Sequence, residues 1–174
     1  MAEVEPGLGD IGCVDIEGDV GFLVRVAQFL NAINAKPWTW RRVWKRARRE
    51  HCIMFVGNGR IVEAEPGGAR EWDLSEYDGR EIAWVRCPEQ YRNAVAQQAL
   101  VLIGTPYSAA DYFALAFHRF HLPFLRRVAL RTTSMICSTL SVVAARRGGW
   151  QMLMPTPAGF VDPFDVAALA EPAA

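Results

Sequence analysis

The chain lacks several features that would place it quickly in a functional class. Its 19 basic and 19 acidic side chains cancel, which excludes a protein that binds polyanions over its whole surface. It has no run of about 18 apolar residues, so we expect no transmembrane helix. Its first six residues are acidic and have no apolar core, so we expect no secretory signal and a cytoplasmic location.

Metal-binding and disulfide patterns are also missing. The four cysteines, at positions 13, 52, 87 and 137, include no C-x-x-C pair, and we expect four free thiols. Two of the three histidines, His118 and His121, are three residues apart but have no acidic or cysteine companion. The sequence therefore predicts neither a metal site nor a cofactor.

What the chain does have is enough apolar material for one folded unit. It contains 174 residues, of which 51% are hydrophobic, and we expect a single domain over residues 1–174. Apolar spacing predicts strands at 11–16, 52–56, 60–64 and 81–86, and helices at 20–31, 88–103 and 140–147. We interpret residues 66–80 as a polar loop and the apolar segment 108–130 as two short helices. This mixture, built on a β-hairpin, predicts an α+β fold.

Basic and aromatic residues are interleaved between positions 36 and 49. Seven Lys and Arg residues alternate there with Trp38, Trp40 and Trp44. The interpretation we favour is an amphipathic segment with a solvated basic face, whose tryptophans pack on the core. Contact with an anionic lipid surface or wall polymer is the alternative, and we expect no nucleic-acid partner.

The predicted hairpin carries two groups suited to acid–base chemistry. His51 begins its first strand, and Glu63 lies twelve residues later on the returning strand. A three-residue loop at Gly57-Asn58-Gly59 would place both side chains on one face, whereas a strict two-residue turn would separate them. Glu65 lies on the same face as Glu63 and is its rival as a partner for His51.

Cys137 occupies a different setting from the other thiols, because it lies at the predicted start of a helix. Unpaired backbone amides and the positive end of the helix dipole stabilise a thiolate there. A thiolate beside a histidine that is oriented by a carboxylate can perform nucleophilic catalysis.

Five motifs occur in an order that resembles a known family. They are Gly9-Asp10-Ile11-Gly12, the run Glu50-His51-Cys52 through Gly59, Ile61 through Gly68, Gly104-Thr105-Pro106-Tyr107-Ser108, and Ile136-Cys137-Ser138. Together they look like the circularly permuted branch of the NlpC-type, papain-like cysteine hydrolases. The resemblance extends over about residues 9–170 and implies a permuted papain-like fold.

The resemblance also implies roles for individual residues. Cys137 matches the nucleophile, His51 the general base, and Glu63 the polar residue that orients the histidine. Tyr107 matches a tyrosine at the substrate pocket. The implied reaction is cleavage of an amide bond through a thioester acyl-enzyme, with peptidoglycan peptides as the first substrate class. Without an export signal, such an enzyme would reach the wall through lysis or from a virion.

Two other functions fit the same residues. The first is a lipid ester or amide hydrolase, or an acyltransferase, working at a membrane surface. The apolar segment 108–130 and the basic segment 36–49 support this alternative, because together they suit a membrane surface. The second is a non-enzymatic binding protein or virion-associated part on the same fold, because filled positions do not by themselves establish catalytic geometry.

Overall fold

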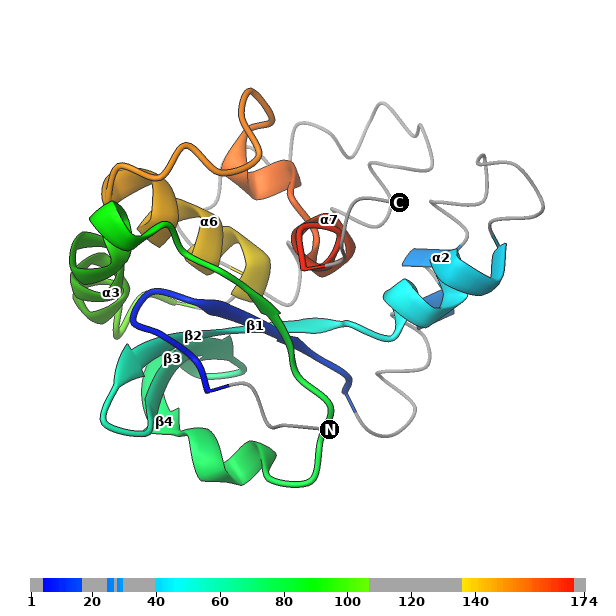
Figure 1. Cartoon of the computed structure of the whole chain (residues 1–174), viewed down its shortest axis with the longest axis horizontal. Helices are drawn as coiled ribbons and strands as arrows, with labels where there is room; N and C mark the ends of the chain where they lie inside the picture. The colour runs from blue at the N-terminus through cyan, green and yellow to red at the C-terminus, as the bar shows by residue number, and fades with distance from the viewer. Residues whose placement is uncertain (1–4, 17–24, 27, 30–39, 107–135, 171–174) are drawn as a thin grey trace.

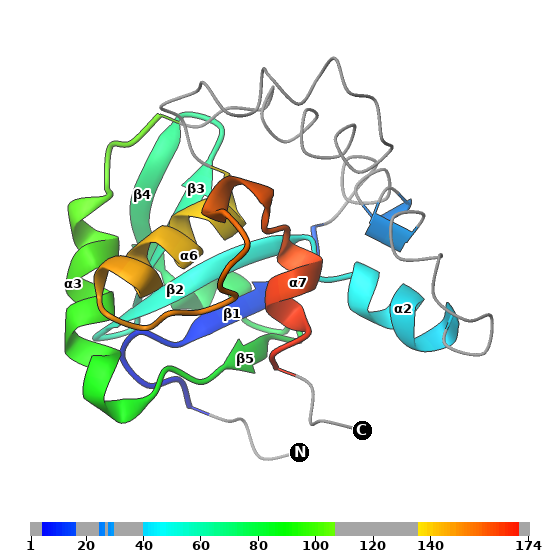
Figure 2. The ribbon, with the colours of Figure 1, turned by 90° about the horizontal axis from the view of Figure 1, so that it is seen from above.

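The computed structural model describes residues 5–16, 25, 26, 28, 29, 40–106 and 136–170. Within them the chain is an α+β protein (Figure 1) with a five-stranded antiparallel sheet in the order β4-β3-β2-β1-β5 (Figure 2). The strands are β1 (Ile11–Val14), β2 (His51–Gly57), β3 (Arg60–Glu65), β4 (Gly68–Asp73) and β5 (Ala83–Val85). The helices are α2 (Trp40–Ala47), α3 (Arg92–Val101), α6 (Cys137–Arg147) and α7 (Pro163–Ala167), with single 3₁₀ turns η2 (Leu74–Tyr77), η3 (Glu89–Tyr91) and η4 (Ala158–Phe160).

The helices α3, α6 and α7 cover one face of the sheet, and α6 crosses β2 and β3 (Figure 2). Alternate strand residues such as Met54 and Val62 point into the main core and meet Leu140 of α6. The residue before each of these, Ile53 in β2 and Ile61 in β3, points to the opposite face of the sheet. There they form a smaller apolar cluster that is covered by the chain between β4 and β5. Both faces of the central strands are therefore buried, although the sheet is antiparallel.

The β2–β3 turn combines the two geometries that the sequence left open. Asn58 and Gly59 form a two-residue turn, both with positive φ (51° and 70°), between the paired residues Gly57 and Arg60. The register then shifts between Phe55 and Gly57, so that Ile53 pairs with Glu63. This bulge adds the residue that a strict two-residue turn would lack. It brings His51 and Glu63 to the same face.

Helix α6 begins at Cys137, as expected. Its N-cap residue, Ile136, is extended (φ −89°, ψ 166°), and the backbone turns helical at the cysteine. The helix ends at Gly148, which packs against α3 so closely that an added Cβ would lie 2.6 Å from Val95 Cγ2. Only glycine allows this approach, which fixes α6 against α3.

Most expected elements within the described residues are confirmed, and one is wrong. Strands β1, β2, β3 and β5 and helices α3 and α6 occur where the apolar spacing predicted them. Residues 66–80, expected to be a loop, instead contain β4 and η2. Tyr107 and the segment 108–130 lie outside the described residues. Among the described helices, none has the length and apolar character needed to cross a bilayer.

Candidate active site

His51 is the first residue of β2, and its side chain is buried. Its Nε2 atom lies 3.1 Å from Glu63 Oε2 and 3.5 Å from Glu65 Oε1. The hairpin register thus delivers both candidate carboxylates to the histidine. Glu63 makes the closer contact and is fully buried, whereas the side chain of Glu65 is 35% exposed.

The Glu63 carboxylate is held by three side chains at once. Arg70 donates to Oε1 from Nε at 2.9 Å and from Nη2 at 2.7 Å, and the Tyr77 hydroxyl donates to Oε2 at 2.5 Å. Burial by itself raises the pKa of Glu63, but the hydrogen bonds from His51, Tyr77 and Arg70 outweigh it and lower the pKa to about 2. Glu63 is therefore ionised throughout the neutral range, in a fixed orientation.

Tyr77 and Arg70 are members of the site that sequence reasoning missed. Arg70 lies in β4, where its guanidinium stacks 4.4 Å from the centroid of the Trp72 ring. Tyr77 ends η2, and burial together with its hydrogen bond to Glu63 raises its pKa strongly, so it stays a protonated donor. Both residues fall in the segment interpreted as a loop. No motif marked them, and only the alternation around Arg70 in β4 and the proximity of both residues to the hairpin could have done so.

The thiol of Cys137 contacts two consecutive residues of β2, His51 and Cys52. A hydrogen bond from Cys52 is the largest influence that lowers the pKa of Cys137, and burial opposes it. The charge of His51 and a hydrogen bond with its ring lower that pKa further. Because Nε2 of His51 faces Glu63, Nδ1 is the ring nitrogen that remains for Cys137.

The pKa of His51 shifts in the opposite direction, upwards. Burial lowers the pKa of His51, but the Cys137 thiolate and Glu63 outweigh burial and raise it to about 10. The two shifts describe one charge distribution, a thiolate beside an imidazolium. This is the ionised form in which a cysteine attacks carbonyl carbon.

Three buried cysteines, Cys13, Cys52 and Cys137, adjoin one another here. Cys13 and Cys52 are directly paired across β1 and β2, and Cys52 also contacts Cys137. Hydrogen bonds with Cys13 and Cys137, followed by burial, raise the pKa of Cys52 well above its ordinary value. Cys52 therefore remains a thiol that donates to Cys137, a polar role that its apolar surroundings in the sequence did not indicate.

Among the described residues, His51, Glu63 and Glu65 offer ligand atoms that lie within 4.8 Å of one another and could in principle hold a metal ion. The partners of Glu63 argue for another role. Arg70 occupies one of its oxygens and Tyr77 shares the other with His51. A guanidinium cation bound to the same carboxylate repels a metal cation. The cluster is better suited to orienting the histidine.

The structure therefore brings together three of the four residues predicted for the site: Cys137, His51 and Glu63. Tyr107, the fourth, lies outside the described residues. The rival carboxylate Glu65 is present at a longer distance. Comparisons with protein-family models, with curated proteins and with solved structures found no match for this chain.

Proposed function

We propose that the protein is a cysteine hydrolase that cleaves an amide bond through a thioester acyl-enzyme, on a fold of the permuted NlpC-type, papain-like kind. The observation that carries the proposal is the contact between Cys137, at the first position of α6, and the buried pair of His51 and Glu63. The lowered pKa of Cys137 supports a nucleophile that is already ionised at neutral pH.

In the proposed reaction the Cys137 thiolate attacks the carbonyl carbon, and the carbonyl electron pair moves to oxygen. The backbone N–H of Cys137 belongs to the first turn of α6, where amides have no partner within the helix, and it stabilises the oxyanion. The His51 imidazolium then protonates the departing amine as the C–N bond breaks. The neutral imidazole afterwards takes a proton from water, which attacks the thioester and regenerates the thiolate.

Glu63 acts on this reaction through His51. It accepts a hydrogen bond from Nε2, which fixes the ring orientation and stabilises the imidazolium. Peptidoglycan stem peptides are the first substrates to test, since the motif resemblance implies them. Cys137→Ala and His51→Ala should each abolish hydrolysis of a confirmed substrate while leaving the fold intact by circular dichroism. Full turnover by either variant would contradict the assignment.

Selective alkylation tests the proposal without a known substrate. We would treat the native protein with iodoacetamide at about pH 6 and map all four cysteines by mass spectrometry. A free thiol with a pKa of about 8.5 is under about one per cent ionised at that pH, so rapid labelling identifies the thiolate. Cys87 is the internal control, because burial raises its pKa to about 11. We expect labelling of Cys137 that His51→Ala abolishes.

Thiolate ultraviolet absorbance provides a second measurement that does not depend on access of the reagent to a buried thiol. The wild type should show one thiolate more than Cys137→Ala at pH values where ordinary thiols are protonated. If the two proteins have equal absorbance and Cys137 resists alkylation, the thiol is not activated. A binding protein on the same fold would then be the better interpretation.

One observation favours the lipid-directed alternative. Trp40 and Trp44 in α2 are 43% and 37% exposed, although the Trp44 ring packs edge-on against Phe29, with the ring centroids 5.0 Å apart. Exposed tryptophan beside basic residues suits a membrane surface. An acyl hydrolase acting there should co-sediment with anionic vesicles at low salt. Failure to bind such vesicles would remove this alternative.

A further inference from the structure

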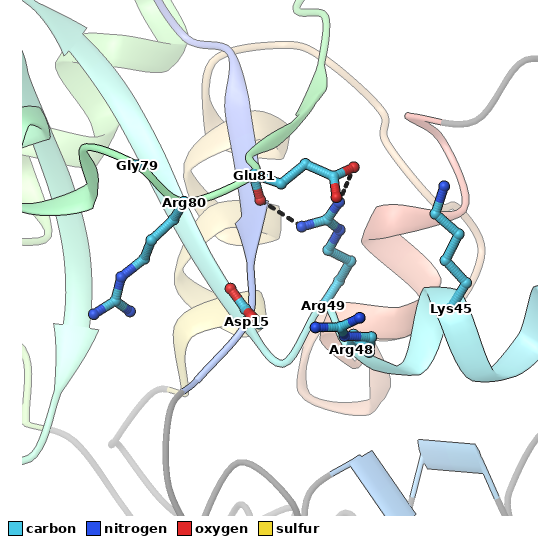
Figure 3. Close-up of a pocket in the computed structure, with 7 residues that line it drawn as sticks. All are labelled: Asp15, Lys45, Arg48, Arg49, Gly79, Arg80 and Glu81. Atoms are coloured by element: carbon cyan, nitrogen blue, oxygen red, sulfur yellow. Dashed lines mark hydrogen bonds and ion pairs between the residues drawn. The ribbon is translucent and has the colours of Figure 1, made fainter.

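A pocket distinct from the Cys137 site lies where the chain enters β2. It has a volume of about 260 Å³, which is below the usual range for a drug-sized ligand (~300–1,000 Å³) and suits a small chemical group. Three segments form it: the end of α2 and the residues after it, the residue after β1, and the loop before β5 (Figure 3). The lining residues are Asp15, Lys45, Arg48, Arg49, Gly79, Arg80 and Glu81.

Arg49 is a largely buried cation with a fixed orientation. Its side chain is 11% exposed, and its Nη2 atom lies 2.6 Å from Glu81 Oε1. Its Nη1 atom donates to the Glu81 backbone carbonyl, and Figure 3 shows both contacts. A guanidinium has five N–H donors, so this anchoring leaves donors for a ligand. The pocket thus contains a prearranged hydrogen-bonding group.

Lys45 and Arg48 add two cations that none of the described residues neutralises. They are three residues apart at the end of α2, and neither forms an ion pair or hydrogen bond with any residue that the structure describes. Two carboxylates line the pocket, Asp15 and Glu81. Glu81 forms an ion pair with Arg49, so Asp15 is the carboxylate that is not paired with Arg49. Arg80 points away from the other lining side chains in Figure 3 and lies over the Tyr77 ring.

Bringing these cations together costs electrostatic free energy unless an anion joins them. The helix dipole offers one compensation, because the C-terminal end of α2 favours positive charge. That effect falls off within the last turn and requires no pocket. The helix dipole therefore does not explain why a cavity bounded by an oriented arginine lies beside these cations.

We propose that this pocket binds the phosphate group of a phosphomonoester ligand. Besides Arg80, which points away, three basic side chains and two carboxylates line the pocket. This leaves an excess of positive charge, which attracts the negative charge of a phosphomonoester, about −1.5 to −2 near neutral pH. The N–H donors of Arg49 that Glu81 does not occupy suit phosphate oxygens, which guanidinium groups bind well. The site is independent of the proposed hydrolase, so Cys137→Ala should bind as the wild type does.

The same helix provides matched controls for the test. Arg41 and Arg42 are exposed cations of α2 that do not line the pocket. We would titrate inorganic phosphate into the full-length protein by isothermal calorimetry at low ionic strength. Lys45→Gln and Arg48→Gln should each weaken binding about tenfold, because a charged hydrogen bond is lost. Arg41→Gln and Arg42→Gln should change the affinity less than about twofold.

Asp15→Asn gives a test of opposite sign. The Asp15 carboxylate forms no ion pair or hydrogen bond with a described residue. Its removal takes away a repulsion of the anion, so phosphate should bind about threefold tighter. Equal weakening by all four cation variants would show general charge attraction and overturn the proposal. So would the absence of saturable binding, or weaker binding by Asp15→Asn.

Vesicles identify the source of the phosphate group. Phosphatidylcholine vesicles that contain phosphatidic acid present the same group on a lipid. Binding that Arg48→Gln weakens and inorganic phosphate competes away would support a lipid headgroup as the ligand. If inorganic phosphate binds with the predicted variant pattern but vesicles do not, the proposal stands with a soluble phosphomonoester.

Discussion

At the scale of single residues, the site depends on an asymmetry between two adjacent thiols. Cys52 and Cys137 are both buried and in contact, yet hydrogen bonding and burial raise the pKa of Cys52, whereas hydrogen bonding lowers the pKa of Cys137 against the opposing effect of burial. The difference arises because Cys52 donates a hydrogen bond to Cys137, and the charge of His51 lowers the pKa of Cys137 further. A neutral thiol that donates a hydrogen bond to the nucleophile is therefore part of the proposed machinery.

Replacing Cys52 tests this dependence. Cys52→Ala removes the donor and should raise the pKa of Cys137 by about one to two units, since a hydrogen bond to a charged group contributes ~1.5–3 kcal/mol. Cys52→Ser keeps a donor and should restore most of the effect. The pH dependence of Cys137 alkylation measures the shift, with Cys87→Ala as the control. Identical profiles for the alanine and serine variants would exclude a donor role.

Tyr77 offers a second test at this scale, directed at the carboxylate. Tyr77→Phe leaves Glu63 buried with one donor fewer, which should lower the free energy of unfolding by about 1–3 kcal/mol. Urea denaturation at neutral pH measures the loss. Tyr91→Phe is the control, because the Tyr91 hydroxyl makes no hydrogen bond with a described residue. Equal losses in the two variants would show that the Tyr77 hydrogen bond carries no special weight.

At the scale of elements, the bulge in β2 decides whether the site exists. Gly57 adopts φ 99° beside the register shift, a conformation that disfavours any residue with a Cβ. Gly57→Ala should lower the free energy of unfolding by about 1–3 kcal/mol and slow alkylation of Cys137 as His51 is displaced. Gly159→Ala, where an added Cβ meets nothing within 4 Å, should have little effect on either measurement.

The hairpin also shows how far the sequence could lead. Its strands and turn residues were predictable from local signals, as was the start of α6 at Cys137. The register was not, because Gly57-Asn58-Gly59 is compatible with two loop lengths and only tertiary packing selects the bulge. Strand β4 was missed because its outer residues Arg70, Glu71 and Asp73 are polar and exposed, as suits a sheet edge. Missing it hid Arg70 and Tyr77.

At the scale of the whole molecule, Glu63 links the site to acid stability. Its pKa falls from an ordinary 4.5 to about 2 in the folded protein. A lowered pKa contributes stability that is fully present above about pH 4.5 and is lost as the pH falls towards 2. The shift corresponds to about 3 kcal/mol. The wild type should therefore lose this much of its unfolding free energy across that window.

Glu63→Gln removes the titration. The variant should be less stable than the wild type at neutral pH but should lose less stability between pH 4.5 and 2. Denaturant unfolding at a series of pH values measures both. Glu71→Gln, which removes an exposed carboxylate of β4, is the control and should follow the wild type. A parallel acid profile for Glu63→Gln would contradict the assigned pKa.

The order of the site residues along the chain has a consequence for biosynthesis. His51 and Glu63 belong to one hairpin, whereas Cys137 begins a helix far closer to the C-terminus. During translation, the ribosome therefore releases the base and its carboxylate partner well before the thiol that they are proposed to activate. Until α6 docks against α3 and β2, a nascent chain contains an acid–base pair without a nucleophile. An enzyme assembled in this order would have no catalytic activity while it is being synthesised.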